Sequence, residues 1–137
     1  MKRLMICAMA GALVACGGGG GDVTAENAAS VSPMRLADAI VSDMREAADV
    51  VNGIQTVSDA EAAKPVLADI GGRYEAQMSA MRNLDQSRIK DPEAFMGKQM
   101  ESADALAGFM NAMSELQKRN VEAAQTIMPE LQAFRPG

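Results

Sequence analysis

The sequence predicts an all-α protein whose ordered part is an antiparallel, up-down-up three-helix bundle. Three long segments carry apolar residues at helical spacing, and only 3% of the 137 residues are aromatic, with no Trp. Alanine and methionine supply much of the apolar bulk, and both favour helices over strands. Short loops join the three segments, so consecutive helices are expected to run antiparallel.

The first helix is predicted over about residues 33–54. Ser32 precedes it as an N-cap, and Pro33 stands at the first helical position, where a missing N–H is tolerated. The residues of its predicted core face share one side at about 100° per residue. They are Leu36, Ala37, Ile40, Val41, Met44, Ala47, Ala48 and Val51.

The second helix is predicted over about residues 59–86. Ser58 and Glu61 have the spacing of a capping box, in which each side chain binds the backbone N–H of the other. Gly71 and Gly72 each lower the helix propensity by about 1 kcal/mol relative to Ala. By helical phase, Gly71 is expected to lie against a neighbouring helix. The predicted core face is Ala63, Val66, Leu67, Ile70, Tyr74, Met81 and Leu84.

The third helix is predicted over about residues 91–127. Asp91 is its N-cap, followed by Pro92 and by Glu93, whose charge suits the positive end of a helix. Pro129 is expected to end it. The predicted core face is Phe95, Met96, Ala103, Leu106, Ala107, Met110, Met113, Val121 and Ala124.

The start of the chain has the pattern of a cleaved secretory signal. Lys2 and Arg3 form a short positive region, and residues 4–15 are an uncharged apolar run. This run is shorter than the roughly 20 residues that a helix needs to span a bilayer. We therefore expect a signal peptide over residues 1–15.

The end of this run, Leu13-Val14-Ala15-Cys16, resembles the lipobox of bacterial lipoproteins. The resemblance implies that the chain is cut before Cys16 and that this cysteine carries fatty acyl chains such as palmitate. Two or three acyl chains would anchor the protein stably to a membrane. Gly17, in place of an Asp, implies the outer membrane by the enterobacterial sorting rule. The domain would face the periplasm, and exposure at the cell surface is left open.

The rest of the chain divides into a tether and a domain. Residues 16–32 are expected to be the lipidated cysteine and a flexible Gly-rich linker, and residues 33–137 the bundle. Residues 59–73, DAEAAKPVLADIGGR, resemble the short Ala-rich helical domains of bacterial lipoproteins. That resemblance implies no particular activity.

Composition excludes several classes of function. The chain has no His, and its two Cys, at positions 7 and 16, both lie in the first sixteen residues. Ser-His-Asp and Cys-His catalysis, His-ligated zinc and His-ligated haem are therefore excluded. No catalytic serine motif or phosphate-binding glycine loop is present, so we expect neither an enzyme nor a bound cofactor. The net charge of −5 disfavours nucleic acid as a partner.

The sequence thus predicts a membrane-anchored lipoprotein whose non-catalytic domain is an interaction or envelope-support module, with an envelope protein as its partner. The alternative is a soft-metal protein that binds Cu(I) or Ag(I) through methionine thioethers. Met34, Met78 and Met100 lie at the edges of the predicted core faces, where a metal could reach them. A carrier of a small apolar ligand would need a cavity of several hundred Å³, which closely packed alanine faces disfavour.

The anchor can be tested by changing Cys16→Ser. The variant should remain an uncut or soluble precursor, because serine offers no thiol for acylation. Membrane fractionation and palmitate labelling measure the outcome. A variant that still labels with palmitate and fractionates with the outer membrane would show that the lipobox interpretation is wrong.

Overall fold

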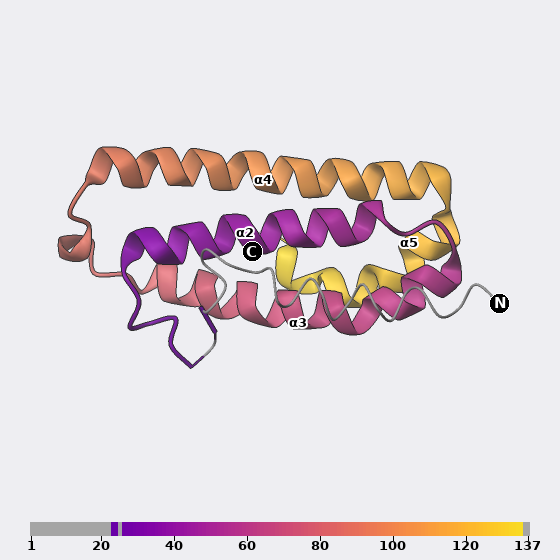
Figure 1. Cartoon of the computed structure of the whole chain (residues 1–137), viewed down its shortest axis with the longest axis horizontal. Coiled ribbons are helices and arrows are strands. Elements are labelled where there is room, and N and C mark those ends of the chain that lie inside the picture. Colours follow the sequence, from indigo (N-terminus) through magenta and orange to yellow (C-terminus); the bar gives the residue numbers. More distant parts are fainter. Residues whose placement is uncertain (1–22, 25, 136–137) are drawn as a thin grey trace.

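A computed structural model describes residues 23–24 and 26–135 of the chain. These residues form four α-helices and two 3₁₀ helices, without a strand, which confirms the all-α prediction (Figure 1). The elements are α2 (Pro33–Asn52), α3 (Val57–Arg82), η1 (Gln86–Arg88), α4 (Pro92–Arg119), α5 (Val121–Ile127) and η2 (Met128–Phe134).

Two of the predicted helix starts are confirmed by their caps. The Ser32 hydroxyl accepts a hydrogen bond from the N–H of Arg35 at the start of α2. The Asp91 carboxylate accepts one from the N–H of Ala94 at the start of α4. Each cap is followed by a proline, and each satisfies an N–H group that has no partner within the first helical turn.

The capping box of α3 lies two residues earlier than predicted. Thr56, rather than Ser58, accepts the N–H of Asp59 at 3.0 Å. The Asp59 carboxylate in turn accepts the N–H groups of Gln55 at 3.1 Å and Thr56 at 3.0 Å. These bonds, led by the one from Gln55, lower the pKa of Asp59. The earlier start is favoured because the Thr56–Asp59 pair satisfies three N–H groups, whereas the predicted Ser58–Glu61 pair would satisfy two.

Helix α2 lies at the centre of the fold, with α4 along one side and α3 along the other (Figure 1). Its predicted core face is confirmed: seven of the eight residues are buried, and Ala48 is half-buried. Because α2 stands between them, α3 and α4 share almost no direct contact. In a three-helix bundle these two helices would pack against each other.

The prediction of one continuous third helix is wrong, and the three-helix bundle is therefore not confirmed. Helix α4 ends at Arg119, and Asn120 has an extended backbone with φ −157° and ψ 94°. The Asn120 side chain accepts the N–H of Ala123 and donates to the carbonyl of Gln55 at 3.2 Å. The Arg119 guanidinium donates to the carbonyl of Ile54 at 2.8 and 3.2 Å. The loop between α2 and α3 thus fixes the point at which the chain turns.

After this turn, α5 and η2 run back along α3 and complete the core. The ring of Phe134 in η2 lies between two other aromatic rings. Its centroid is 5.1 Å from that of Tyr74 on α3 and 5.0 Å from that of Phe109 on α4. These separations are typical of favourable aromatic pairs. Phe134 therefore joins the two helices that α2 keeps apart.

The segment before α2 packs against the helices, although the sequence placed the start of the domain at residue 33. Val23 is 1% exposed and belongs to the hydrophobic core. The Gln77 amide on α3 donates to the carbonyl of Val23 at 3.1 Å. Arg88 in η1 donates to two further backbone carbonyls of this segment, at 3.3 and 2.9 Å. Residues 23–24 and 26–32 are therefore part of the packed domain.

Gly71 and Gly72 differ in burial, as their positions around the helix predicted. Gly71 is buried against η2, and an ideal Cβ there would lie 3.3 Å from the Cβ of Ala133 and 3.5 Å from the carbonyl oxygen of Glu130. Gly72 is exposed, and nothing lies within 4 Å of its ideal Cβ. The missing side chain at Gly71 lets η2 approach α3 closely.

The two glycines give a paired test of this contact. Gly72→Ala should raise the free energy of unfolding by about 0.5–1 kcal/mol, because alanine favours the helix and restricts the unfolded chain. Gly71→Ala should gain less than half of that or lose stability, because its methyl group must displace Ala133. Urea denaturation of the full chain measures both changes. Equal gains would mean that η2 does not lie tightly against α3 in solution.

Candidate functional site

Helix α4 is the outermost of the long helices, since α2 covers only one side of it (Figure 1). Ion pairs also join α4 to α2. The Lys98 ammonium lies 2.8 Å from Asp38 of α2 and 3.0 Å from Glu101, which also binds Arg45 of α2 at 2.9 Å. Hydrogen bonds to Asp38 and Glu101 raise the pKa of Lys98, and those from Lys98 and Arg45 lower the pKa of Glu101. The side toward the core buries Phe95, Ala105, Phe109, Ala112 and Leu116.

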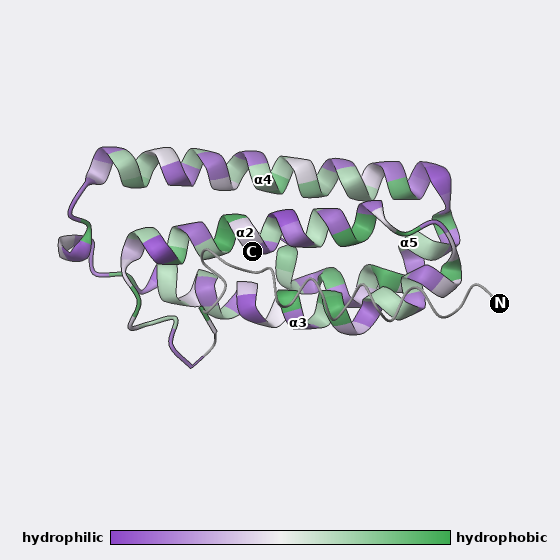
Figure 2. Cartoon of the chain, in the orientation of Figure 1, coloured by the Kyte–Doolittle hydropathy of each residue, from purple (hydrophilic) through white to green (hydrophobic). Residues whose placement is uncertain are grey.

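The opposite side of α4 is also apolar, and it faces solvent. Met96, Met100 and Met110 are 63%, 67% and 57% exposed, and Ala103 and Ala107 between them are exposed as well. We call these five residues the methionine–alanine face. They recur at alternating steps of four and three residues, the spacing that aligns one side of a helix in coiled coils. Figure 2 shows hydrophobic residues recurring along the whole of α4.

The core face predicted for this helix is confirmed at Phe95 and wrong at four other positions. It placed Met96, Ala103, Ala107 and Met110 toward the core, whereas the structure exposes all four. The buried face carries two phenylalanines and a leucine, which remove more apolar area from water than methionines and alanines do. Because α2 is the only long helix that lies alongside α4, the helix buries the apolar face turned toward α2 and leaves the opposite one uncovered.

A polar cluster around Arg73 joins α2 to α3. The Arg73 guanidinium lies 3.0 Å from Asp43, 2.9 Å from Glu46 and 2.7 Å from Asp69. Asp43 is 6% exposed and accepts a further hydrogen bond from Gln77 at 2.8 Å. Burial alone would lower the pKa of Arg73, but the three carboxylates outweigh it, so this pKa lies above its ordinary value. With its cation shared among three carboxylates, the cluster is a structural link between helices.

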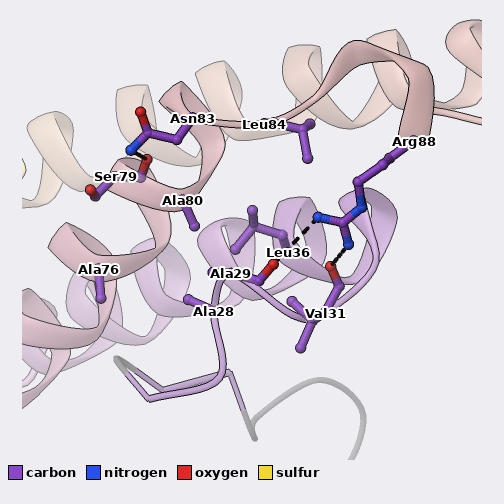
Figure 3. A pocket seen from close by; sticks show the side chains of 10 residues that line it. All are labelled: Ala28, Ala29, Val31, Leu36, Ala76, Ser79, Ala80, Asn83, Leu84 and Arg88. Carbon is purple, nitrogen blue, oxygen red and sulfur yellow. Dashed lines mark hydrogen bonds between the residues drawn. The ribbon is translucent and has the colours of Figure 1, made fainter.

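A hollow of about 340 Å³ lies between residues 28–31 and the C-terminal part of α3 (Figure 3). Its walls are largely alanine, valine and leucine. Two of its three polar side chains are engaged: Asn83 donates to the carbonyl of Ser79, and Arg88 to those of Ala29 and Val31. The third is the Ser79 hydroxyl. Ligand sites usually combine an apolar cavity with free, convergent polar groups. This hollow is apolar but has no convergent set of free polar groups.

The three methionines of the predicted soft-metal site lie on three different helices. Met34 is half-buried at the start of α2, beside a second hollow of about 440 Å³. Met78 is half-buried on α3 and packs against the core. Met100 faces solvent on α4, and α3 and α4 flank α2 from opposite sides (Figure 1). Cys16 lies outside the described residues, so its acylation stays a prediction.

In the part of the chain that the structure describes, no group of three or more His, Cys, Asp or Glu side chains could hold a metal ion. None of the helices there combines the length and the apolarity needed to cross a bilayer. No protein-family model matches this chain, and no curated protein or solved structure matches it. The function is therefore inferred from the exposed surfaces of the chain. The methionine–alanine face holds three of the five large hydrophobic side chains that are exposed in the described residues.

The structural role of the Arg73 cluster can be tested by a charge rescue. Arg73→Met should lower the free energy of unfolding by about 2–4 kcal/mol, because Asp43 would remain buried without a cation. Adding Asp43→Asn should recover at least half of the loss, since a neutral amide costs less to bury. Urea denaturation of the single and double variants measures the coupling. A double variant no more stable than Arg73→Met would assign the loss to packing of the arginine stem instead.

Proposed function

We propose that this protein is a bacterial lipoprotein, anchored through Cys16, whose non-catalytic helical domain binds another protein through the methionine–alanine face. In this proposal the acyl chains hold the chain to the outer membrane, and the domain works in the periplasm. The exposure of the methionine–alanine face carries the proposal. Contiguous apolar surface of this kind commonly marks a site of interaction in soluble domains.

The chemistry of the face suits a protein partner. Methionine is flexible and polarisable, so it adapts to the shape of a partner surface. At ~1.5 Å per residue, residues 96–110 extend over about 21 Å, long enough for a helix or a groove to lie along them. Lys98 and Glu101 are turned toward α2, where they pair with Asp38 and Arg45, and the face itself contains no charged residue. The exposed Asp104, four residues after Met100, lies along one edge of the face.

Soft-metal binding is the second candidate function. Met96 and Met100 place two exposed thioethers on consecutive turns of α4, within reach of one ion. Cu(I) and Ag(I) prefer such soft sulfur ligands. Met100 belongs both to this pair and to the set expected from the sequence, whereas Met34 and Met78 lie on other helices.

Site-specific photo-crosslinking in cells that express the full chain tests the interaction role. A photo-reactive phenylalanine analogue in place of Gln99, at the exposed rim of the face, should form adducts with protein. The same analogue in place of Ala68, exposed on α3, should form few and serves as the control. Adding Met100→Glu should abolish the adducts at position 99, because the carboxylate resists desolvation. Equal yields at positions 99 and 68 would contradict the proposal.

Replacing both Met96 and Met100 by leucine separates the two candidate functions. Leucine keeps the volume and the apolar character of methionine but removes the sulfur ligand. Adducts that persist in the Met96→Leu/Met100→Leu chain support an apolar protein contact. If the double change abolishes both the adducts and the heat of Ag(I) binding in calorimetry, the result favours soft-metal binding through the two thioethers.

A further inference from the structure

The pattern of the methionine–alanine face points to its occupant: we propose that two copies of this chain pair through antiparallel α4 helices. This inference rests on the proposed interaction role of α4 and names the partner. It is carried by three properties of the helix, which are the order of large and small residues, the charges at its two ends and the length of the face.

The face is self-complementary about Ala103. Met96 lies seven residues before Ala103, and Met110 lies seven residues after it. A two-fold axis beside Ala103 therefore sets Met96 of one copy against Met110 of the other. The same rotation sets Met100 beside the small Ala107 of the second copy and brings the two Ala103 methyl groups together at the axis. Such an interface uses the same surface on both copies, as two-fold symmetry requires.

Antiparallel pairing also distributes volume better than parallel pairing does. In a parallel pair each residue would meet its own equivalent, so the two alanine layers at Ala103 and Ala107 would follow one another and leave a gap. In the antiparallel pair, Met100 fills the space above Ala107 on each side of the axis. The antiparallel arrangement is favoured because it fills the interface evenly, whereas a gap in an apolar interface loses van der Waals contacts.

The charges at the ends of α4 favour the same orientation. The first turn of the helix carries the acidic Glu93, and the last turn carries the basic Lys118 and Arg119. Lys118 also pairs with Glu115 of its own helix at 2.9 Å, and Arg119 also donates to the carbonyl of Ile54, so part of this positive charge is already compensated. Antiparallel pairing brings the acidic end of each copy toward the basic end of the other, whereas parallel pairing would bring like charges together. This complementarity works against the repulsion that a net charge of −5 per chain creates.

The size of the face predicts reversible pairing. A single helix seam of about 21 Å buries less than the roughly 1,200 Å² that stable complexes bury in total. Two copies should therefore exchange between monomer and dimer. Confinement of the proposed lipid-anchored chains to one membrane would raise their effective concentration and favour the pair.

Sedimentation velocity of the full chain in detergent tests self-association directly. The unaltered chain should shift from monomer toward dimer as its concentration rises. Met100→Glu should weaken this association at least about tenfold, because each dimer would desolvate two new carboxylates. Ala68→Glu adds the same charge at an exposed position on α3 and should leave the association unchanged. Circular dichroism confirms that both variants stay folded.

Disulfide formation between single-cysteine changes tests the orientation. A mixture of Met96→Cys and Met110→Cys chains should form mixed disulfide dimers in higher yield than either chain forms alone. Parallel pairing would give the reverse, since each cysteine would then meet its own equivalent. The unaltered chain, taken through the same oxidation, reports any pairing through Cys7 and Cys16.

The photo-adducts at position 99 separate the failure of this inference from the failure of the proposed function. An adduct of twice the mass of the chain supports self-pairing. Adducts only with a different protein would overturn self-pairing and leave the interaction role intact. A chain that is monomeric at every concentration and forms no adduct at position 99 would overturn both.

Discussion

The ring of Phe134 holds together two sides of the molecule that otherwise barely touch. Helices α3 and α4 flank α2, and the Phe134 centroid lies 5.1 Å from that of Tyr74 and 5.0 Å from that of Phe109. The C-terminal segment reaches this position because Arg119 and Asn120 turn the chain against the loop between α2 and α3. The core is therefore closed by the last helical turns of the chain, and α4 is left with only one covered side.

Local signals in the sequence predicted the caps of two of the three long helices. The caps at Ser32 and Asp91 bind N–H groups three residues away, so the sequence around each is enough to find it. The break at Asn120 depends instead on the carbonyls of Ile54 and Gln55, which are far away in the sequence. An asparagine inside an apolar periodic segment does not reveal such a partner, and the predicted helix therefore ran past it.

The candidate site could not be predicted from the sequence for a different physical reason. Helical spacing identifies the apolar faces of α4 but does not say how many neighbours are available to cover them. The helix has two such faces, and the one with Phe95 and Phe109 is buried because it removes more apolar area from water. The same limit applies to Asp43, whose burial follows from Arg73 and Gln77 on another helix. A mismatch between pattern and burial is a frequent property of functional surfaces.

If Cys16 is the proposed lipid anchor, the burial of Val23 limits how far the domain would stand from the membrane. A tether from Cys16 to Pro33 could have stretched over about 60 Å, at up to ~3.6 Å per residue. Because Val23 is already packed into the core and held by Gln77, only the seven residues 16–22 would be left, with a reach of about 25 Å. A lipid-anchored copy would thus stay close to the bilayer surface, and it would meet molecules in the same leaflet far more readily than anything across the periplasm.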